Sequence, residues 1–253
     1  MLIINADDWG SSRQITSRIE ECFDAGVVDT VSAMVFMSDS ERAAQLSTAK
    51  SIETGLHLNL TTPFDSGRVS DRLLASQQKV IKYLRRNRVA PYLYNPILGK
   101  DFDYLFKAQY DEFYRLYGIP PSRIDGHNHM HLCANVLLGN FIPMRTKVRR
   151  SFYFEKREKG LVNRSLRFVV DSMLQKKYIC TDYFLHIGQF CHKGVKGIWN
   201  LQKLQDLARR ADVELLLHPH QDIDYKYVMN PEFLDAISAI PRGKHKRINE
   251  IEH

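Results

Sequence analysis

Histidines and aspartates that could hold a metal ion gather in four short polar clusters. These are residues 5–10, 55–60, 125–131 and 218–222, and they contain six of the ten histidines of the chain. Neutral imidazole and carboxylate suit zinc and other divalent cations, and a set of two histidines and one carboxylate leaves positions open for water and substrate. The clusters together therefore predict a site for a divalent cation.

Each cluster also has an ordinary structural explanation when it is taken alone. Asp7 and Asp8 could form a turn or cap a helix, and His57 could be a hydrogen-bonded histidine of the core. The run from His127 to His131 could be a purely structural cluster, and His218 before a proline could simply end a strand. The occurrence of all four in one chain favours the metal site.

The elements that position these clusters are short apolar runs alternating with helical patterns. The runs predict about seven strands, at residues 2–6, 30–37, 54–60, 123–127, 148–154, 180–187 and 213–218. This alternation favours an α/β fold with a mostly parallel sheet, open or closed into a barrel. Each cluster lies at the end of a predicted strand, and ligands bind at the carboxyl-terminal edge of such sheets.

Several helices connect the predicted strands. One begins at Ser11 or Ser12, carries an apolar stripe and ends at Gly26. Two others cover residues 40–50 and 103–117, and a further amphipathic helix ends near Arg210. Residues 61–103 have a looser pattern with three prolines, and we interpret them as an insertion or lid within one domain that spans residues 1–253. If the run after Asp125 is an extended strand, His127, His129 and His131 share one face.

Length and composition indicate a globular protein. The chain has 253 residues, of which 44% are hydrophobic and 26% charged. It contains no apolar run near the ~20 residues of a membrane span, and the N-terminus becomes polar too early for a secretory signal, so we expect a soluble, cytoplasmic protein. The four cysteines are Cys22, Cys133, Cys180 and Cys191. They lack CxxC spacing, which argues against a disulfide framework or a zinc ribbon.

The formal net charge of +7 could favour anionic partners. No RNP, KH, zinc-finger or helix-turn-helix pattern accompanies the charge, so we expect no specific nucleic-acid partner. There is also no heptad pattern or partner-binding helix, which leaves the oligomeric state open, a homo-oligomer included.

The clusters resemble, in order and wording, the YdjC-like (chitooligosaccharide deacetylase) family, a relative of the NodB-type polysaccharide deacetylases. The matching segments span residues 1 to about 220: NADDWG, AGVVDTVSAMVF, TGLHLNLT, RIDGHNHMH, the Val148–Arg149 pair and ELLLHP. No motif matches in residues 61–103 or 151–180. Two departures stand out: Trp9 replaces the usual phenylalanine, and His220 replaces the usual glycine after the HP pair, which changes that loop.

The resemblance implies a deformed, TIM-barrel-like (β/α) fold with one divalent cation. Asp8, His57 and His127 would be the metal ligands, and Asp7 would be the general base. His218 would be the acid or would stabilise the oxyanion. Magnesium, zinc, manganese and cobalt all remain open as the cation, with magnesium and zinc in the foreground.

The implied activity is hydrolysis of a linear amide C–N bond: removal of the N-acetyl group from a chitooligosaccharide-like sugar or glycoconjugate, with release of acetate. Four residues are predicted substrate contacts: Trp9, Asp125, His129 and Arg149. Asp125 and His129 could alternatively hold a ligand histidine, and Arg149 could orient Asp7. Tyr92 and Tyr94 could stack on the sugar or merely anchor a loop.

Two other functions are compatible with the sequence. The same barrel edge could support a metal-dependent phosphoesterase or another amidohydrolase, although no second carboxylate-rich cluster indicates two-metal chemistry. A noncatalytic protein that binds an anionic polymer through its basic charge is the weaker alternative. The sequence does not determine the sugar, or whether His129, His131 or His220 also binds the cation.

Overall fold

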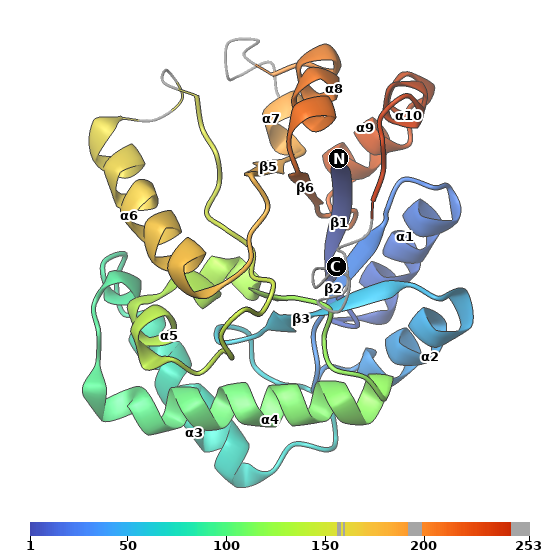
Figure 1. The fold of residues 1–253 in the computed structure, drawn as a ribbon. Coiled ribbons are helices and arrows are strands. Elements are labelled where there is room, and N and C mark those ends of the chain that lie inside the picture. The colour runs from blue at the N-terminus through green and yellow to red at the C-terminus, as the bar shows by residue number, and fades with distance from the viewer. Residues whose placement is uncertain (156–157, 159, 192–198, 244–253) are drawn as a thin grey trace.

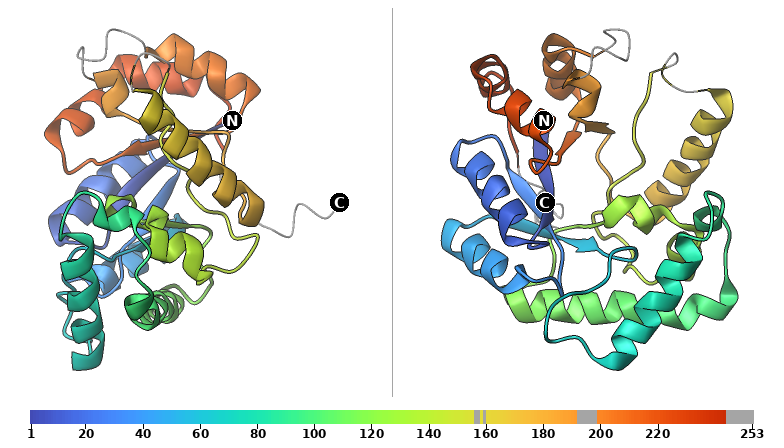
Figure 2. Two further views of the ribbon diagram at one scale, coloured as in Figure 1. Left: turned by 90° about the vertical axis from the view of Figure 1, so that its left-hand side faces the viewer. Right: turned by 180° about the vertical axis from the view of Figure 1, so that it is seen from behind.

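The computed structural model describes residues 1–155, 158, 160–191 and 199–243. Six parallel strands form one curled sheet, with helices around its outside (Figures 1 and 2). The strand order is β4-β3-β2-β1-β6-β5. The strands are β1 (Leu2–Trp9), β2 (Thr30–Ala33), β3 (Glu53–Leu58), β4 (Ile124–Gly126), β5 (Tyr183–His186) and β6 (Val213–Leu217).

The sheet is a half-barrel, so the prediction of about seven strands in a barrel is corrected. Residues 148–154 form no strand. Val148 makes an isolated bridge to Ile124, the preceding Lys147 makes one to Ile179, and the Tyr153 amide donates to the Phe184 carbonyl at 2.8 Å. Lys147, Val148 and Arg149 are all buried in this segment. This irregular segment lies between the two edge strands of the sheet, β4 and β5.

The predicted helices near the N-terminus and before β6 are confirmed. Helix α1 (Arg13–Asp24) begins where the Ser12 side chain accepts a hydrogen bond from the Ile15 amide, and Gly26 follows it with a φ of 71°. The other helices of the described residues are α2 (Ser40–Lys50), α3 (Asp71–Leu84), α4 (Gly99–Tyr117), α5 (Ala134–Gly139), α6 (Leu161–Lys177), α7 (Gly188–Cys191), α8 (Leu201–Arg210), α9 (Asp222–Val228) and α10 (Pro231–Ser238).

Residues 61–103, interpreted from the sequence as an insertion or lid that could carry a short helix of its own, contain the 14-residue helix α3. Helix α3 packs against α4, and both belong to the crossover from β3 to β4 (Figure 1). Tyr92 and Tyr94, between them in the chain, are 61% and 48% exposed. A lid function for this segment stays a prediction.

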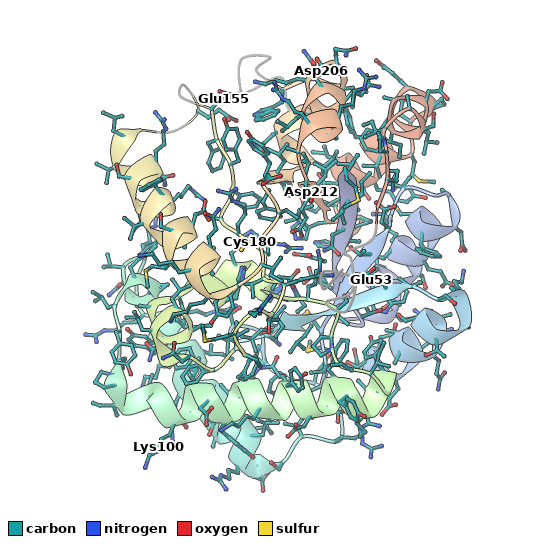
Figure 3. The ribbon with its side chains drawn as sticks, in the orientation of Figure 1. Glu53, Lys100, Glu155, Cys180, Asp206 and Asp212 are labelled. Atoms are coloured by element: carbon teal, nitrogen blue, oxygen red, sulfur yellow. The ribbon has the colours of Figure 1, made fainter. Side chains whose placement is uncertain are left out.

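Strand β1 lies at the centre of the sheet, between β2 and β6, and all eight of its residues are buried. Side chains fill the space between the sheet and the helices (Figure 3). Because β1 is central, the aspartates at its carboxyl end lie in the middle of the edge where parallel strands place their ligands.

Neither disulfides nor a membrane helix contribute to the described part of the chain. All four cysteines lie within it and are unpaired. Of the helices in the described ranges, none combines the length and apolar character that crossing a bilayer requires.

Candidate metal centre and active site

The structure brings together three residues predicted as metal ligands. Asp8 lies near the end of β1, His57 on β3 and His127 directly after β4. An Asp8 carboxylate oxygen, Oδ1, is 2.8 Å from His127 Nδ1 and 3.3 Å from His57 Nε2. One donor atom of each residue lies within 4.8 Å of those of the other two. The three chain segments therefore converge on one point at the sheet edge.

A bulge in β1 directs two consecutive aspartates toward this point. The pairing with β2 shifts between Ala6 and Trp9, and Asp8 has a φ of 68°. In a regular strand Asp7 and Asp8 would point to opposite faces. Here both carboxylates approach His57 Nε2, at 3.8 Å for Asp7 and 3.3 Å for Asp8. Left-handed backbone at a residue other than glycine costs on the order of 1 kcal/mol, and such strain concentrates at functional sites.

The three histidines of the third cluster do not share a face, contrary to the prediction from an extended strand. Strand β4 ends at Gly126, and the chain turns into a short 3₁₀ segment, His127–Leu132, in which Asn128 and His129 have positive φ values. A Cβ on Gly126 would lie 2.7 Å from the His131 amide nitrogen, so the turn is too tight for any other residue to fit without a shift. Only His127 therefore faces Asp8.

The other two histidines of this run lie apart. His131 is buried, and its Nε2 donates a hydrogen bond of 3.0 Å to the Arg149 carbonyl. The His129 ring packs edge-on against Phe152, with 4.6 Å between ring centroids. Neither belongs to the three-residue group around Asp8.

Asp125 holds the His57 ring in place. His57 Nδ1 is 2.7 Å from Asp125 Oδ1, and because an ionised carboxylate can only accept, Nδ1 donates. Nε2 therefore faces Asp8. Burial would lower the pKa of His57, but the charges of Asp7 and Asp125 outweigh it and raise the pKa to about 10. The raised pKa reflects the concentration of negative charge around the ring.

Arg149 binds three carboxylates beneath the site. It donates to both oxygens of Asp7, at 2.7 and 2.8 Å, lies 2.8 Å from Asp125 Oδ2, and donates to Glu214 at 2.7 Å. Burial alone would raise the pKa of Asp7, but Arg149 and the neighbouring histidines together outweigh it and hold the pKa of that carboxyl below its usual range. Asp7 is consequently ionised and fixed in orientation.

Two residues of this buried network, Arg123 and Glu214, were not identified from the sequence. Arg123 donates to Glu214 at 2.9 Å and to Ser32 Oγ at 2.6 Å, and both charged side chains are almost completely buried. Glu214 had a signal in the sequence, because it is a charged residue in an otherwise apolar strand run, whereas Arg123 stands in a polar one. Asn5 also supports the site, by donating to Asp7 Oδ1 at 2.7 Å.

The last cluster approaches Asp7 from the neighbouring strand. His218 Nε2 is 4.0 Å from Asp7 Oδ2, and the His218 amide donates to Asp224 at 3.1 Å. His220 follows with its ring centroid 5.5 Å from that of His218. Burial lowers the pKa of His220, and its Nδ1 has no hydrogen-bond partner.

The predicted substrate contacts are mostly inaccessible. Trp9 is fully buried and donates its indole N–H to the Ala43 carbonyl at 3.1 Å, so its ring has no face open for stacking on a sugar. Asp125 and Arg149 are also buried, and their contacts show that they orient His57 and Asp7. His129 is only partly buried and keeps a surface that a ligand could reach.

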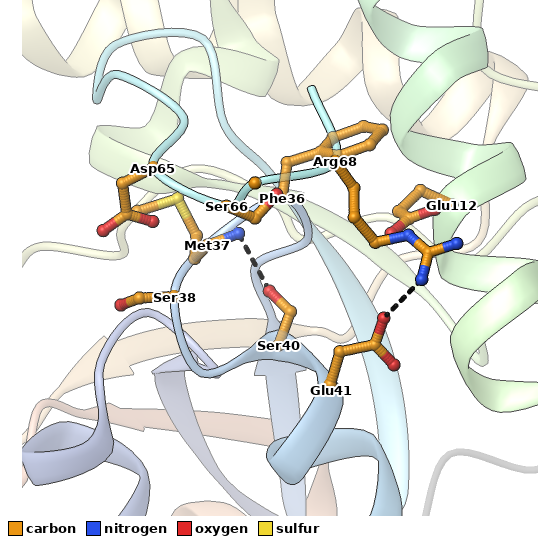
Figure 4. Close-up of a pocket in the computed structure, with 10 residues that line it drawn as sticks. Phe36, Met37, Ser38, Ser40, Glu41, Asp65, Ser66, Arg68 and Glu112 are labelled. Atoms are coloured by element: carbon orange, nitrogen blue, oxygen red, sulfur yellow. Dashed lines mark hydrogen bonds and ion pairs between the residues drawn. The ribbon is translucent and has the colours of Figure 1, made fainter. Parts of the chain in front are cut away.

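Two pockets of the described surface lie away from these residues. One of about 300 Å³ lies between the segment after β2, residues 65–68 and α4 (Figure 4). Its lining includes Glu41, which pairs with Arg68, and a further carboxylate, Glu112. The other, of about 360 Å³, is lined by aromatic rings around Trp199 and Phe233. Neither contains a predicted site residue.

Comparison with known proteins identifies relatives along the whole chain. A family model described as YdjC-like protein matches residues 1–252. The chitooligosaccharide deacetylase of Yersinia enterocolitica is 27% identical over 100% of this chain and 89% of its own. The chitooligosaccharide deacetylase of Proteus mirabilis is 32% identical over 54% of this chain and 52% of its own. The carbohydrate deacetylase of Mus musculus is 34% identical over 53% and 44%.

The matches to the Proteus and mouse proteins thus span about half the length of those relatives. Among solved structures, a candidate cellobiose-phosphate cleavage protein from Enterococcus faecalis V583 has a TM-score of 0.66 and 18% identity, and covers 96% of this chain and 97% of that chain. At that identity the likeness shows a common fold.

Proposed function

This chain belongs to the YdjC-like family, and we propose on that premise that it is a metal-dependent carbohydrate deacetylase. Its reaction would be hydrolysis of the N-acetyl group of a chitooligosaccharide-like sugar, with release of acetate. The relatives named chitooligosaccharide or carbohydrate deacetylase support the reaction class. The observation that carries the proposal is the convergence of Asp8, His57 and His127 beside an oriented Asp7.

The charges of the site fit a divalent cation. Four buried carboxylates, those of Asp7, Asp8, Asp125 and Glu214, face two buried guanidiniums, which leaves an excess of two negative charges when the imidazoles are neutral. Such an excess is costly in a protein interior unless a positive group balances it. A divalent ion held by Asp8, His57 and His127 would balance it and take the place of the proton on His57.

The donor set also indicates the class of cation. One carboxylate oxygen and two imidazole nitrogens are typical of zinc and related transition metals, whereas magnesium prefers oxygen ligands and retained water. We therefore expect zinc, cobalt or manganese to support activity better than magnesium. When bound, the cation would polarise the acetamide carbonyl and make water more acidic.

Asp7 has the position of a general base. Arg149 holds both of its oxygens, so one face of the carboxylate stays directed at the site near His57. A carboxylate with a lowered pKa is ionised throughout the neutral range but is a weak base. It can accept a proton in the reaction because the water that it deprotonates has itself been made acidic.

His218 has a position suited to stabilising the oxyanion. Its Nε2 is 4.0 Å from Asp7 Oδ2, so the two groups flank the same space from β6 and β1. Water would add to the acetamide carbon as Asp7 takes its proton. The C–N bond would then break as Asp7 passes that proton to the departing nitrogen, which leaves as an amine, while the Nε2–H of His218 donates a hydrogen bond to the acetamide oxygen.

Acetate release from N-acetylated chitooligosaccharides tests this function. Wild-type activity should disappear with a chelator and return with added zinc, cobalt or manganese. Asp8→Asn should lose both bound metal, measured by elemental analysis, and activity, whereas Asp7→Asn should keep the metal and lose only activity. Asp103→Asn, on the exposed face of α4, is the matched control.

Full activity after exhaustive chelation would contradict the metal mechanism. Hydrolysis of phosphate esters in a parallel panel, without acetate release from acetylated sugars, would replace the proposed reaction with phosphoester hydrolysis on the same site.

A further inference from the structure

Two histidines on neighbouring strands contact each other at the border of the candidate active site. His186 ends β5, and His218 follows β6 directly. Because the strands are parallel and His186 pairs with Leu216, the two imidazoles lie side by side. His186 Nε2 is 3.2 Å from His218 Nδ1, and the opposite nitrogen of His218, Nε2, points toward Asp7.

One backbone amide determines the direction of this hydrogen bond. The Gly188 N–H donates to His186 Nδ1 at 2.9 Å. An amide N–H can only donate, so Nδ1 of His186 must act as the acceptor and carries no proton. Neutral His186 therefore carries its single proton on Nε2, and this N–H donates a hydrogen bond to His218 Nδ1. Neutral His218 must then carry its own proton on Nε2.

We propose that His186 is a positioning residue that fixes the tautomer of His218, so that the N–H of His218 faces the reacting amide. This inference rests on the proposed deacetylase function, in which the Nε2–H of neutral His218 donates a hydrogen bond to the acetamide oxygen as negative charge develops on it. In the opposite tautomer, a lone pair would face the developing negative charge and repel it. The tautomer of a catalytic histidine is commonly set in this way by the partner of its other ring nitrogen.

The surroundings of His186 support a fixed ring. Its two nitrogens contact Gly188 and His218, and the Phe152 ring stands edge-on to it, with 6.2 Å between centroids. Asp224 accepts the His218 amide hydrogen and lies 3.8 Å from His186 Nε2, which fixes the loop on which His218 stands. Both imidazoles are only partly buried, so a substrate can reach His218.

A cation is the competing occupant of this cluster. His186, His218 and Asp224 each offer a donor atom within 4.8 Å of those of the others. If a metal ion were bound there, His218 Nδ1 would be a ligand rather than a hydrogen-bond acceptor. We favour the hydrogen bond because the Gly188 amide already gives His186 the required proton position.

The test compares His186→Phe, which removes both ring nitrogens, with His186→Gln, whose amide can still donate to His218 Nδ1. NMR correlation of ring protons with ¹⁵N in the full-length protein reports which nitrogen of His218 is protonated. We expect Nε2–H in the wild type and in His186→Gln, and a mixture of tautomers in His186→Phe. Tyr183→Phe, on the same strand, is the control and should match the wild type.

Kinetics on an N-acetylated chitooligosaccharide provide the second measurement. Loss of an orienting partner commonly costs about 10- to 100-fold in activity. We expect kcat to fall by about that factor in His186→Phe and KM to stay unchanged, with His186→Gln recovering most of the loss. A merely structural role would lower both variants alike and would leave the tautomer of His218 unaffected.

Three results would overturn the proposal: Nδ1–H on His218 in the wild type, equal kcat in the Phe and Gln variants, or a second equivalent of zinc lost in both variants. If no acetylated sugar is hydrolysed but the NMR pattern is as expected, the deacetylase function fails while the hydrogen-bond arrangement stands. Since the wild-type NMR measurement needs no substitution, a variant that fails to fold does not prevent the test.

Discussion

Replacing Arg149 by methionine should destabilise the fold strongly. Arg149 is buried and pairs with Asp7, Asp125 and Glu214, at distances from 2.7 to 2.8 Å. The change removes one positive charge and leaves those carboxylates with a single buried guanidinium, that of Arg123. A buried charge without its partner cannot regain the hydration that it loses on folding.

The expected magnitude follows from this burial. Breaking one buried ion pair typically costs about 3–5 kcal/mol, and Arg149 serves several. Total stabilities are about 5–15 kcal/mol, so the variant should lose a large part of its free energy of unfolding. For a chain of this size the loss corresponds to a fall of roughly 6–20 °C in the melting temperature.

The loss should depend on pH. In the wild type the pKa values of Asp7 and Asp125 are lowered in the folded protein: burial opposes ionisation, but Arg149 outweighs it. These carboxyls therefore stabilise the fold above about pH 4, the unfolded value, and lose that contribution as pH falls through their folded pKa values. Without Arg149, protonation would relieve the buried charge, so the stability difference should be largest near pH 8 and shrink toward pH 5.

Urea denaturation with chelator present, at several pH values, measures this difference without a contribution from metal binding. Arg115→Met is the matched control, because Arg115 also binds two carboxylates, Glu41 and Glu112, but is 38% exposed. Exposed ion pairs contribute about 0–1 kcal/mol. Equal losses in the two variants, or a loss in Arg149→Met that does not change with pH, would refute the reasoning.

Three further predictions concern the framework of the site. Gly126→Ala should cost about 1–3 kcal/mol in urea denaturation, because its Cβ would meet the His131 backbone at 2.7 Å, whereas Gly67→Ala, with open space around it, should be neutral. Trp9→Phe should lose about 1–3 kcal/mol, because a buried carbonyl loses its partner, and KM should not change; a raised KM would restore Trp9 as a substrate contact. Burial lowers the pKa of His131 to about 4, below its unfolded value of about 6.5, so its contribution to stability is present above pH 6.5 and lost as pH falls toward 4. His131→Gln should flatten the pH dependence of the unfolding free energy in that window, and an unchanged slope would argue against a buried neutral imidazole.

Much of the fold was predictable because its local signals agree with its tertiary structure. The Ser12 cap, the stripe through Ile19 and Cys22, and Gly26 mark one helix completely in the sequence. The strand expected at residues 148–154 failed for a tertiary reason. Its apolar and aromatic residues are typical of a strand, but Arg149 turns inward to reach carboxylates on β1 and β6, and the segment meets β4 through an isolated bridge at Val148.

The candidate site was predictable in its residues but not in its geometry. Parallel strands bring their carboxyl ends to one edge, so the sequence alone is enough to place polar clusters after strands near each other. It does not identify the partners of those residues, because the partners depend on strand order. Glu214 meets Arg123 only because β6 joins β1 on the side opposite β2 and the sheet curls. His186 was overlooked for the same reason, since no polar cluster surrounds it in the sequence.

The irregular backbone of the site accounts for the chemistry that a regular sheet could not provide. A regular β1 would direct only one of Asp7 and Asp8 at His57, and a regular β4 would align three imidazoles on one face. The bulge at Asp8 instead places a candidate ligand and a candidate base side by side, and the turn after Gly126 leaves a single imidazole facing them. Because Arg149 then ties the base to Asp125 and Glu214, the positions of base and ligands depend on one another. It follows that substitutions beneath the site should change activity and stability together, whereas substitutions of His218, which approaches from outside this network, should affect activity far more than stability.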